Sequence, residues 1–206
     1  MPKIVDHDQR RVELVSATWR IIARDGIEGA TMREIAAEAG FSNGALKPYF
    51  SSKEDLLTFA FAHVFRETNQ RIAIATEGKS GLAALRVFCH EVLPLDDEKV
   101  SEARIVISFW QRALNHPDKA ALHGQSMAQW SRSILEYLTI ARTRGEAGTS
   151  IADEDFVGLL MNMLLGAQIS AALSPAGCSP PQLISQLDGL LGLIREPTSD
   201  ITLVSP

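Results

Sequence analysis

The sequence contains few of the features that mark secreted, metal-binding or membrane proteins. Among 206 residues there are only two cysteines, Cys89 and Cys178, which form no metal-binding spacing and are too few for a disulfide framework. The N-terminus has no apolar segment of the kind found in signal peptides. Polar and glycine residues interrupt the longest apolar segment, 156–173, so we expect no membrane span. A cytoplasmic protein fits these absences.

Signatures of catalysis are also missing. There is no glycine-rich phosphate loop and no G-x-S-x-G motif. Cys89, His90 and Glu91 are consecutive, and consecutive residues of a helix point in different directions, so they form no catalytic group. His116 and His123 could share a helix face, but no third ligand stands at a supporting spacing. The sequence therefore predicts no metal, no cofactor and no enzymatic activity.

The net charge of −5 counts against a protein that binds nucleic acid. The charge is unevenly distributed, which weakens this argument slightly. Residues 1–53 hold eight basic and seven acidic residues, whereas the rest of the chain has a net charge of −6. Only cations close to phosphates release counterions. Arg33, Lys47 and Lys53 surround the segment described below, so the net charge does not exclude DNA binding.

No segment alternates apolar and polar residues as a half-buried strand does, and no internal repeat is present. Apolar residues recur with the period of a helix, which predicts an all-α fold with about nine helices. Gly26 is expected to end the first of them. Ser51 and Glu54 have the spacing of a capping box that opens a long helix joining the N-terminal unit to the rest. The expected helices span residues 8–25, 31–39, 42–47, 53–76, 82–93, 96–115, 117–144, 153–173 and 181–194.

The segment 31–50 reads as two short helices that meet at a tight corner. Thr31 and Glu34 have the spacing of a capping box, and Gly40 stands where a left-handed residue would end the first helix. Ser42 can cap a second helix. The helical period turns Phe41, Leu46 and Phe50 inward, whereas Ser42, Asn43, Gly44 and Lys47 face outward. This is the layout of a helix–turn–helix, although amphipathic hairpins are common in all-α proteins.

Residues 10–57 resemble the DNA-binding domain of TetR-family transcriptional repressors. The positions that carry the resemblance are Ala17, Gly26, Thr31, Ile35-Ala36, Ala39-Gly40, Ser42, Gly44, Leu46, Tyr49-Phe50 and Ser52-Lys53-Glu54. The C-terminal part resembles the BetI-like branch, through SFWQRALNHPDKAAL, Trp130, Gly145 in a loop, and LLGAQISAALSP.

The resemblance implies a homodimer that represses promoters and leaves its double-stranded DNA operator when a small-molecule effector binds. It implies a helix–turn–helix domain at 1–52, a helical-bundle ligand-binding and dimerisation domain at 53–196 with helix 53–76 as a strut, and a tail at 197–206. Two other interpretations remain open. One is a small all-α ligand-binding protein or enzyme that uses the C-terminal cavity, and the other is an adaptor whose helix–turn–helix packs against a protein.

Carried over by position, the resemblance places Ser42, Asn43 and Gly44 at base edges and lets Arg33 reach a base or a phosphate. It implies phosphate contacts for Thr31, Lys47, Tyr49 and Lys53. By default the basic residues are solvated surface groups, and Tyr49 could instead pack against the long helix. The family usually has Tyr at Lys47, and His or a similar residue at Pro48. Proline lacks an N–H and crowds the carbonyl four residues earlier, so the second helix should end at or before Lys47.

For the effector pocket and the dimer interface the resemblance indicates regions, and plain core packing remains the alternative for both. If Trp110 and Trp130 face one cavity, a cationic or aromatic effector becomes plausible. The candidate pocket residues are Phe109, Trp110, Met127, Trp130, Tyr137, Met161 and Gln168. The candidate interface, on the last two long helices, is Gly166, Ala167, Ala171, Leu183, Leu187, Leu190, Leu191 and Ile194.

Overall fold

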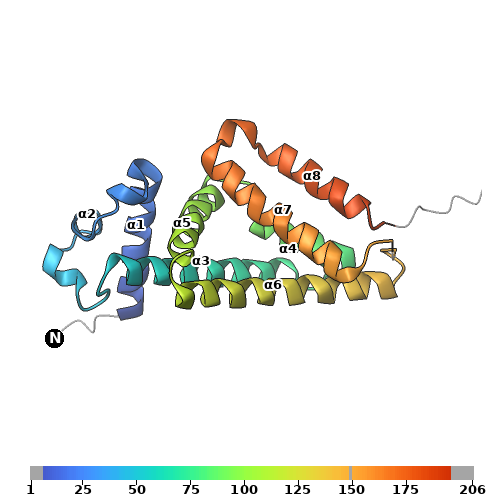
Figure 1. The fold of residues 1–206 in the computed structure, drawn as a ribbon, viewed down its shortest axis with the longest axis horizontal. Helices are drawn as coiled ribbons and strands as arrows, with labels where there is room; N and C mark the ends of the chain where they lie inside the picture. Colours follow the sequence, from blue (N-terminus) through green and yellow to red (C-terminus); the bar gives the residue numbers. More distant parts are fainter. Residues whose placement is uncertain (1–6, 149, 196–206) are drawn as a thin grey trace, which may run out of the picture.

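The computed structural model describes residues 7–148 and 150–195, and these residues form helices and connecting loops without a β-strand (Figure 1). The predicted tail at 197–206 lies outside them. The elements are α1 (His7–Gly29), α2 (Met32–Glu38), η1 (Asn43–Leu46), α3 (Lys53–Ala75), α4 (Gly81–Val92), α5 (Asp97–Ala113), α6 (Pro117–Thr143), α7 (Asp153–Leu173), η2 (Pro175–Gly177) and α8 (Pro180–Gly192).

The all-α prediction is confirmed, with eight α-helices in the described chain and a short 3-10 helix where the second helix of the corner was expected. That 3-10 helix ends at Leu46, as the argument from Pro48 required. The capping box of Thr31 and Glu34 is present, and Gly40 has a φ of 74°. These three features depend on chemistry local to a few residues, which is why the sequence reveals them.

One predicted helix end and one predicted capping pair are wrong. The first helix continues through Gly26 to Gly29. Gly26 thus lies inside the helix and does not end it. The long helix is capped by Ser52, whose side chain accepts a hydrogen bond from the Asp55 N–H, while Asp55 accepts one from the Ser51 N–H. The capping pair is therefore displaced by one residue from the predicted Ser51 and Glu54.

The core is divided into two clusters, and α3 runs through both. Residues 56–64 of α3 pack with α1, α2 and η1 in an N-terminal cluster, whereas Ile72 near its end packs in a C-terminal cluster with α4, α6, α7 and α8. Figure 1 shows α3 passing from the small group of helices at one end of the molecule into the larger bundle. This arrangement suits the connecting role expected of the long helix.

The α5 helix also joins the two parts of the molecule, which the sequence did not indicate. Ile105, Val106 and Phe109 belong to the N-terminal cluster although they lie far along the chain. The Phe109 ring stacks on Phe61 of α3 with 4.1 Å between centroids. At the end of α5, Arg112 pairs with Glu54 in the first turn of α3 at 3.3 Å. Both α3 and α5 therefore support the helices that carry the corner.

Candidate functional site: an exposed helical corner and a cavity behind it

A backbone hydrogen bond and buried side chains hold the turn between α2 and η1, which we call the corner. After Gly40, the Phe41 N–H returns to the Ala36 carbonyl at 2.8 Å and closes the end of α2. Leu46 and Phe50 then anchor η1, since each side chain is fully buried. The guanidinium of Arg11 lies over the Phe50 ring at 5.0 Å. Close packing of these side chains thus fixes the inner side of the corner, and its outer face points away from the core.

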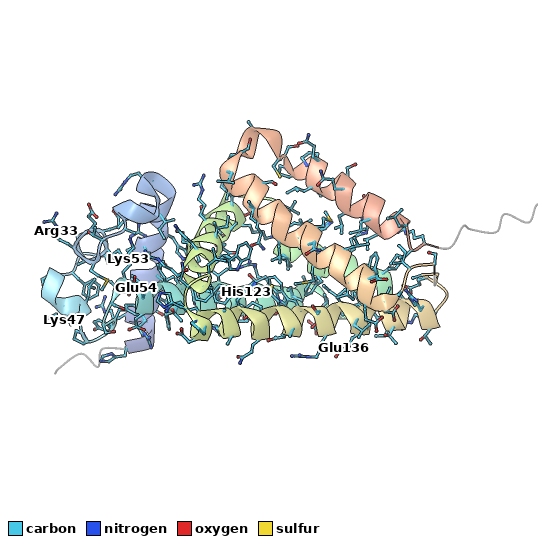
Figure 2. All side chains as sticks on the ribbon, in the orientation of Figure 1. Arg33, Lys47, Lys53, Glu54, His123 and Glu136 are labelled. Carbon is cyan, nitrogen blue, oxygen red and sulfur yellow. The ribbon has the colours of Figure 1, made fainter. Side chains whose placement is uncertain are left out.

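The outer face carries most of the residues predicted to contact DNA. Arg33, Ser42, Gly44 and Lys47 are exposed, and Figure 2 shows Arg33 and Lys47 at the outer end of the molecule. Asn43 begins η1, but its side chain lies outside the described part of the structure. The Ser42 hydroxyl makes no capping bond to η1, unlike the expected cap.

Three predicted DNA contacts have structural partners of their own. Thr31 is exposed, but its hydroxyl donates to Glu34 at 2.6 Å, and this hydrogen bond holds the pKa of Glu34 below its usual value. Tyr49 is half-buried and its ring lies beside Phe41 and His7. Lys53 is half-buried at the first position of α3.

The acidic residues near the corner are paired, which reduces the repulsion that DNA would meet. Arg20 donates to Glu38 at 2.7 Å and Arg24 lies 3.6 Å from the same carboxylate. The hydrogen bond from Arg20 lowers the pKa of Glu38. With Glu34 engaged in the cap, Arg33 and Lys47 are the exposed charges on the outer face that can meet phosphates.

A cavity lies behind the corner, between α3, α4, α5, α6 and α7. The volume of the cavity is about 30 Å³, and all the space between its walls, including the open mouth, is about 450 Å³. An organic ligand would therefore need the walls to move apart. The walls are formed by Phe61, Val64, Phe65, Thr68, Glu91, Val92, Lys99, Glu102, Ala103, Val106, Trp110, Met127, Trp130, Leu165 and Gln168.

Four of the predicted pocket residues, Trp110, Met127, Trp130 and Gln168, line this cavity together. The other three lie elsewhere, and we no longer assign them to its walls. Phe109 stacks on Phe61 in the N-terminal cluster, Tyr137 packs beside Phe88, and Met161 is buried in the C-terminal cluster. Sequence reasoning missed the contribution of α3, although Phe61, Phe65 and Thr68 are spaced to share one helix face.

The cavity offers aromatic faces and a free acceptor. Trp110 donates its indole N–H to His123 at 3.1 Å, and Trp130 donates to Asn69 at 3.1 Å. Both indole N–H groups are thus satisfied within the protein, and both rings form part of the cavity wall. Gln168 is only 7% exposed, and its side-chain oxygen has no hydrogen-bond partner. Since buried polar atoms are nearly always paired, this oxygen is suited to a donor group of a ligand.

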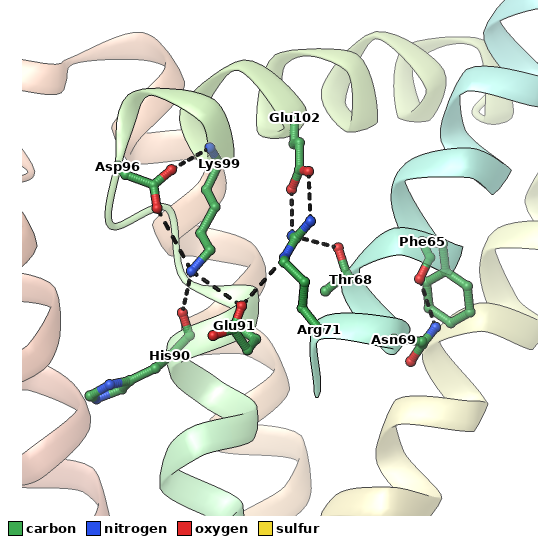
Figure 3. A network of polar contacts seen from close by, with 9 residues as sticks. All are labelled: Phe65, Thr68, Asn69, Arg71, His90, Glu91, Asp96, Lys99 and Glu102. Carbon is green, nitrogen blue, oxygen red and sulfur yellow. Dashed lines mark hydrogen bonds and ion pairs between the residues drawn. The ribbon is translucent and has the colours of Figure 1, made fainter. Parts of the chain in front are cut away.

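An ion network closes the polar end of the cavity (Figure 3). Arg71 donates two hydrogen bonds to the Glu102 carboxylate, at 3.0 and 2.9 Å, and its Nε lies 3.3 Å from Glu91. Lys99 lies 3.4 Å from the same Glu91 oxygen. Burial alone would lower the pKa of Arg71, but the hydrogen bonds and charges of the two carboxylates outweigh it and raise the pKa. Burial raises the pKa of the Glu102 carboxyl, and the hydrogen bonds and charge of Arg71 oppose this rise.

The predicted dimer interface is largely occupied by the fold of the single chain. Ala171, Leu183, Leu187, Leu191 and Ile194 are fully buried in the protomer, Ala167 is buried, and Leu190 is partly buried. Their apolar period serves the packing of α7 and α8 against the other helices. The exposed face of α7 instead presents Leu159, Asn162, Gly166, Ile169 and Leu173 at alternating spacings of three and four residues.

This exposed stripe also explains the high hydropathy of α7. Within the described residues α7 is the one helix long and apolar enough to cross a membrane, by length and composition, and 44% of its most apolar window is buried. Its inward face is core, and Leu159, Ile169 and Leu173 are among the large apolar side chains exposed on the surface. A stripe with 3-4 spacing is suited to pairing with another helix.

Acid is expected to destabilise the protein through the buried His63 and the half-buried His123. Burial lowers the pKa of His63 and His123, so the unfolded chain binds their protons more readily. Their stabilising effect is complete above about pH 6.5, the ordinary histidine value, and is lost as pH falls through the lowered folded pKa. The free energy of unfolding in urea should therefore fall between pH 7 and pH 5. His123→Gln keeps an acceptor for Trp110 but cannot be protonated, and should make that fall shallower; an unchanged slope would contradict this assignment.

Comparison with known proteins agrees with this arrangement. The family description "Bacterial regulatory proteins, tetR family" matches residues 14–58, and "BetI-type transcriptional repressor, C-terminal" matches residues 82–194. The transcriptional regulator PksA of Bacillus subtilis is 34% identical over 139 residues, covering 67% of this chain and 68% of that protein. The regulator BetI of Burkholderia cenocepacia is 29% identical over 167 residues, covering 74% and 81%.

Solved structures share the whole fold. A transcriptional regulator from Rhodococcus sp. Rha1 superposes with a TM-score of 0.78 at 28% identity, over 89% of this chain and 95% of that one. A regulator from Saccharomonospora viridis, crystallised with choline, has a TM-score of 0.84 at 20% identity, over 92% and 100%. The exposed corner, the two matched segments and these relatives lead to one conclusion: the chain belongs to the TetR family of transcriptional regulators, with a BetI-type C-terminal region.

Proposed function

We propose that the protein is a homodimeric repressor that binds a pseudo-palindromic operator and is released by a small-molecule effector. Residues 1–52 would bind DNA and residues 53–196 would bind the effector and form the dimer. The observation that carries the proposal is the corner itself, in which Ser42, Gly44 and Lys47 are exposed directly above the buried Leu46 and Phe50. A short helix presented this way can enter a major groove with its first residues at base edges.

The dimer would form through the exposed stripe of α7 together with the outer face of α8. Gly166 stays in the proposed interface because it is exposed, and Leu159, Asn162, Ile169 and Leu173 join it. A two-fold axis through this surface would repeat the corner at the far side of the partner. Two such corners would read half-sites roughly 34–36 Å apart, or a multiple of that spacing.

The effector would bind in the cavity behind the corner. Aromatic ring faces, the free oxygen of Gln168 and the carboxylates of Glu91 and Glu102 favour a small organic cation. The choline seen in the regulator from Saccharomonospora viridis makes choline the first compound to test. Since α3 and α5 form walls of the cavity and also support the N-terminal cluster, a ligand that spreads these walls would shift the corner. It can do so only by its difference in affinity for the two states.

A gel-shift experiment tests the proposal. Fragments of the organism's DNA bound by the protein are selected, and their affinity is measured between 50 and 200 mM salt with and without choline. If the protein contacts 6–10 phosphates, affinity should fall by about 10³–10⁵-fold over that range. A panel of amines and aromatic compounds follows if choline has no effect. Absence of any sequence-selective, salt-dependent binding would refute DNA recognition, and binding unaffected by the whole panel would refute effector control by these classes.

A further inference from the structure

The two carboxylates in the cavity wall are held very differently. Glu102 is only 6% exposed and receives two hydrogen bonds from Arg71 at 2.9–3.0 Å. Glu91 makes longer contacts, 3.3 Å from Arg71 Nε and 3.4 Å from Lys99 Nζ, and both reach the same oxygen. Strong hydrogen bonds between charged groups are about 2.7–2.9 Å long. Glu91 is therefore the more weakly held of the two carboxylates.

Lys99 places an ammonium group of the chain itself in the cavity wall. Its Nζ donates to the His90 carbonyl at 3.2 Å and lies 3.4 Å from Glu91 and 3.8 Å from Asp96. Lys99 stands in the first turn of α5, whereas His90 and Glu91 are near the end of α4. Figure 3 shows the side chain reaching across from one helix to the other. Lys99 thus ties the start of α5 to the end of α4.

The helix that carries Lys99, α5, extends from this network to the elements that support the corner. The α5 helix packs against α1, and its middle residues Ile105, Val106 and Phe109 lie in the N-terminal cluster. Val106 and Trp110 of the same helix line the cavity. If the contacts of Lys99 at the start of α5 were broken, a shift of this helix would therefore reach the elements that carry the corner.

We propose that Lys99 is an internal competitor for the effector: an organic cation that enters the cavity displaces the Lys99 ammonium from Glu91 and so unfastens α5 from α4. This proposal rests on the proposed function, because it takes the cavity as the effector site. The flexible stem of Lys99 lets its charge move toward Asp96 and solvent, since the Asp96 side chain is 55% exposed. The incoming cation takes over the pairing of Glu91.

The charge balance favours a cation over a neutral molecule of the same shape. The network contains two cations, Arg71 and Lys99, and three acids, Glu91, Asp96 and Glu102, which leaves a net charge of −1. A neutral ligand that displaced Lys99 would leave Glu91 with fewer partners in a largely buried site, and an unpaired buried charge is costly. Selectivity for a positive charge is thus tied to the release of Lys99.

Calorimetric titration of the full-length protein with tetramethylammonium chloride tests the proposal. Lys99→Met should bind this cation at least about fivefold more tightly than wild type, because the competitor is gone, whereas Lys99→Arg should stay near wild type. Glu91→Gln should weaken binding at least about tenfold, since the charge that pairs with the cation is lost. To wild type and Lys99→Met, 3,3-dimethylbutan-1-ol, a neutral alcohol whose tert-butyl group has the shape of the cation, should bind more weakly than tetramethylammonium, and Glu91→Gln should reduce this preference for the cation. Lys119→Met removes another largely buried lysine, on α6, and should change nothing.

Operator binding separates this proposal from the proposed function. Without any ligand, Lys99→Met should already bind the selected operator about tenfold more weakly than wild type, since α5 is unfastened. If wild type binds the operator and responds to the cation, but Lys99→Met binds the cation no more tightly, the competitor role is wrong and the repressor function stands. If tetramethylammonium binds neither wild type nor Lys99→Met, the proposal is also overturned. Loss of operator binding by wild type would instead refute the proposed function.

Discussion

Gly44→Glu is expected to lower the affinity for operator DNA by about 100-fold while leaving the melting temperature unchanged. Gly44 is exposed in η1, and a Cβ built there meets no other atom within 4 Å, so the fold tolerates a side chain. If the corner enters the major groove, the new carboxylate faces phosphates and base edges. Like charges brought together at an interface cost several kcal/mol, and each 1.4 kcal/mol is tenfold in affinity. Fluorescence anisotropy with labelled operator measures the loss.

Gly124→Glu is the matched control for this variant. Gly124 is also exposed and open to a Cβ, but it lies on α6, away from the corner, and the change in net charge is identical. It should bind the operator like wild type. Equal losses in both variants would show that net charge alone is responsible. An unchanged affinity in Gly44→Glu would mean that the corner does not approach DNA.

The corner could be predicted closely because its determinants are local. The cap at Thr31, the left-handed Gly40 and the stop before Pro48 each act within a few residues, and each is found where the sequence placed it. The end of the first helix could not be predicted in the same way. Gly26 has the residue type of a helix end, but α1 continues through it to Gly29.

The cavity shows where local reasoning fails. Trp110, Trp130 and Gln168 could be proposed from residue type, but their partners Phe65, Glu91 and Lys99 come from helices whose neighbours are set by packing. The same limit applies to the dimer face. Periodicity identified the apolar stripe of α8 at Leu183 and Leu187, but it cannot say whether such a stripe faces the same chain or a second one. The structure assigns that stripe to the protomer core and leaves the other face of α7 exposed.

That exposed face gives the second large expected effect: Ile169→Glu should convert the proposed dimer to a monomer. Ile169 is 42% exposed and lies in the middle of the α7 stripe, between Gly166 and Leu173. In a two-fold interface each substitution appears twice, so two unpaired carboxylates would be brought together in an apolar contact. We expect the dissociation constant of the dimer to rise at least about 100-fold, since each buried unpaired charge costs several kcal/mol. Sedimentation velocity measures it.

The matched control is Ile74→Glu, which makes the same change at a side chain that is 75% exposed near the end of α3. It lies outside the stripe and should leave the dimer intact. Because a monomer can hold only one half-site, Ile169→Glu should also lose the tight binding to a full operator and keep a weaker binding to a half-site. If Ile169→Glu remained dimeric while folding normally, α7 would not form the interface. A dimer disrupted by Ile74→Glu instead would place the contact at the far end of α3.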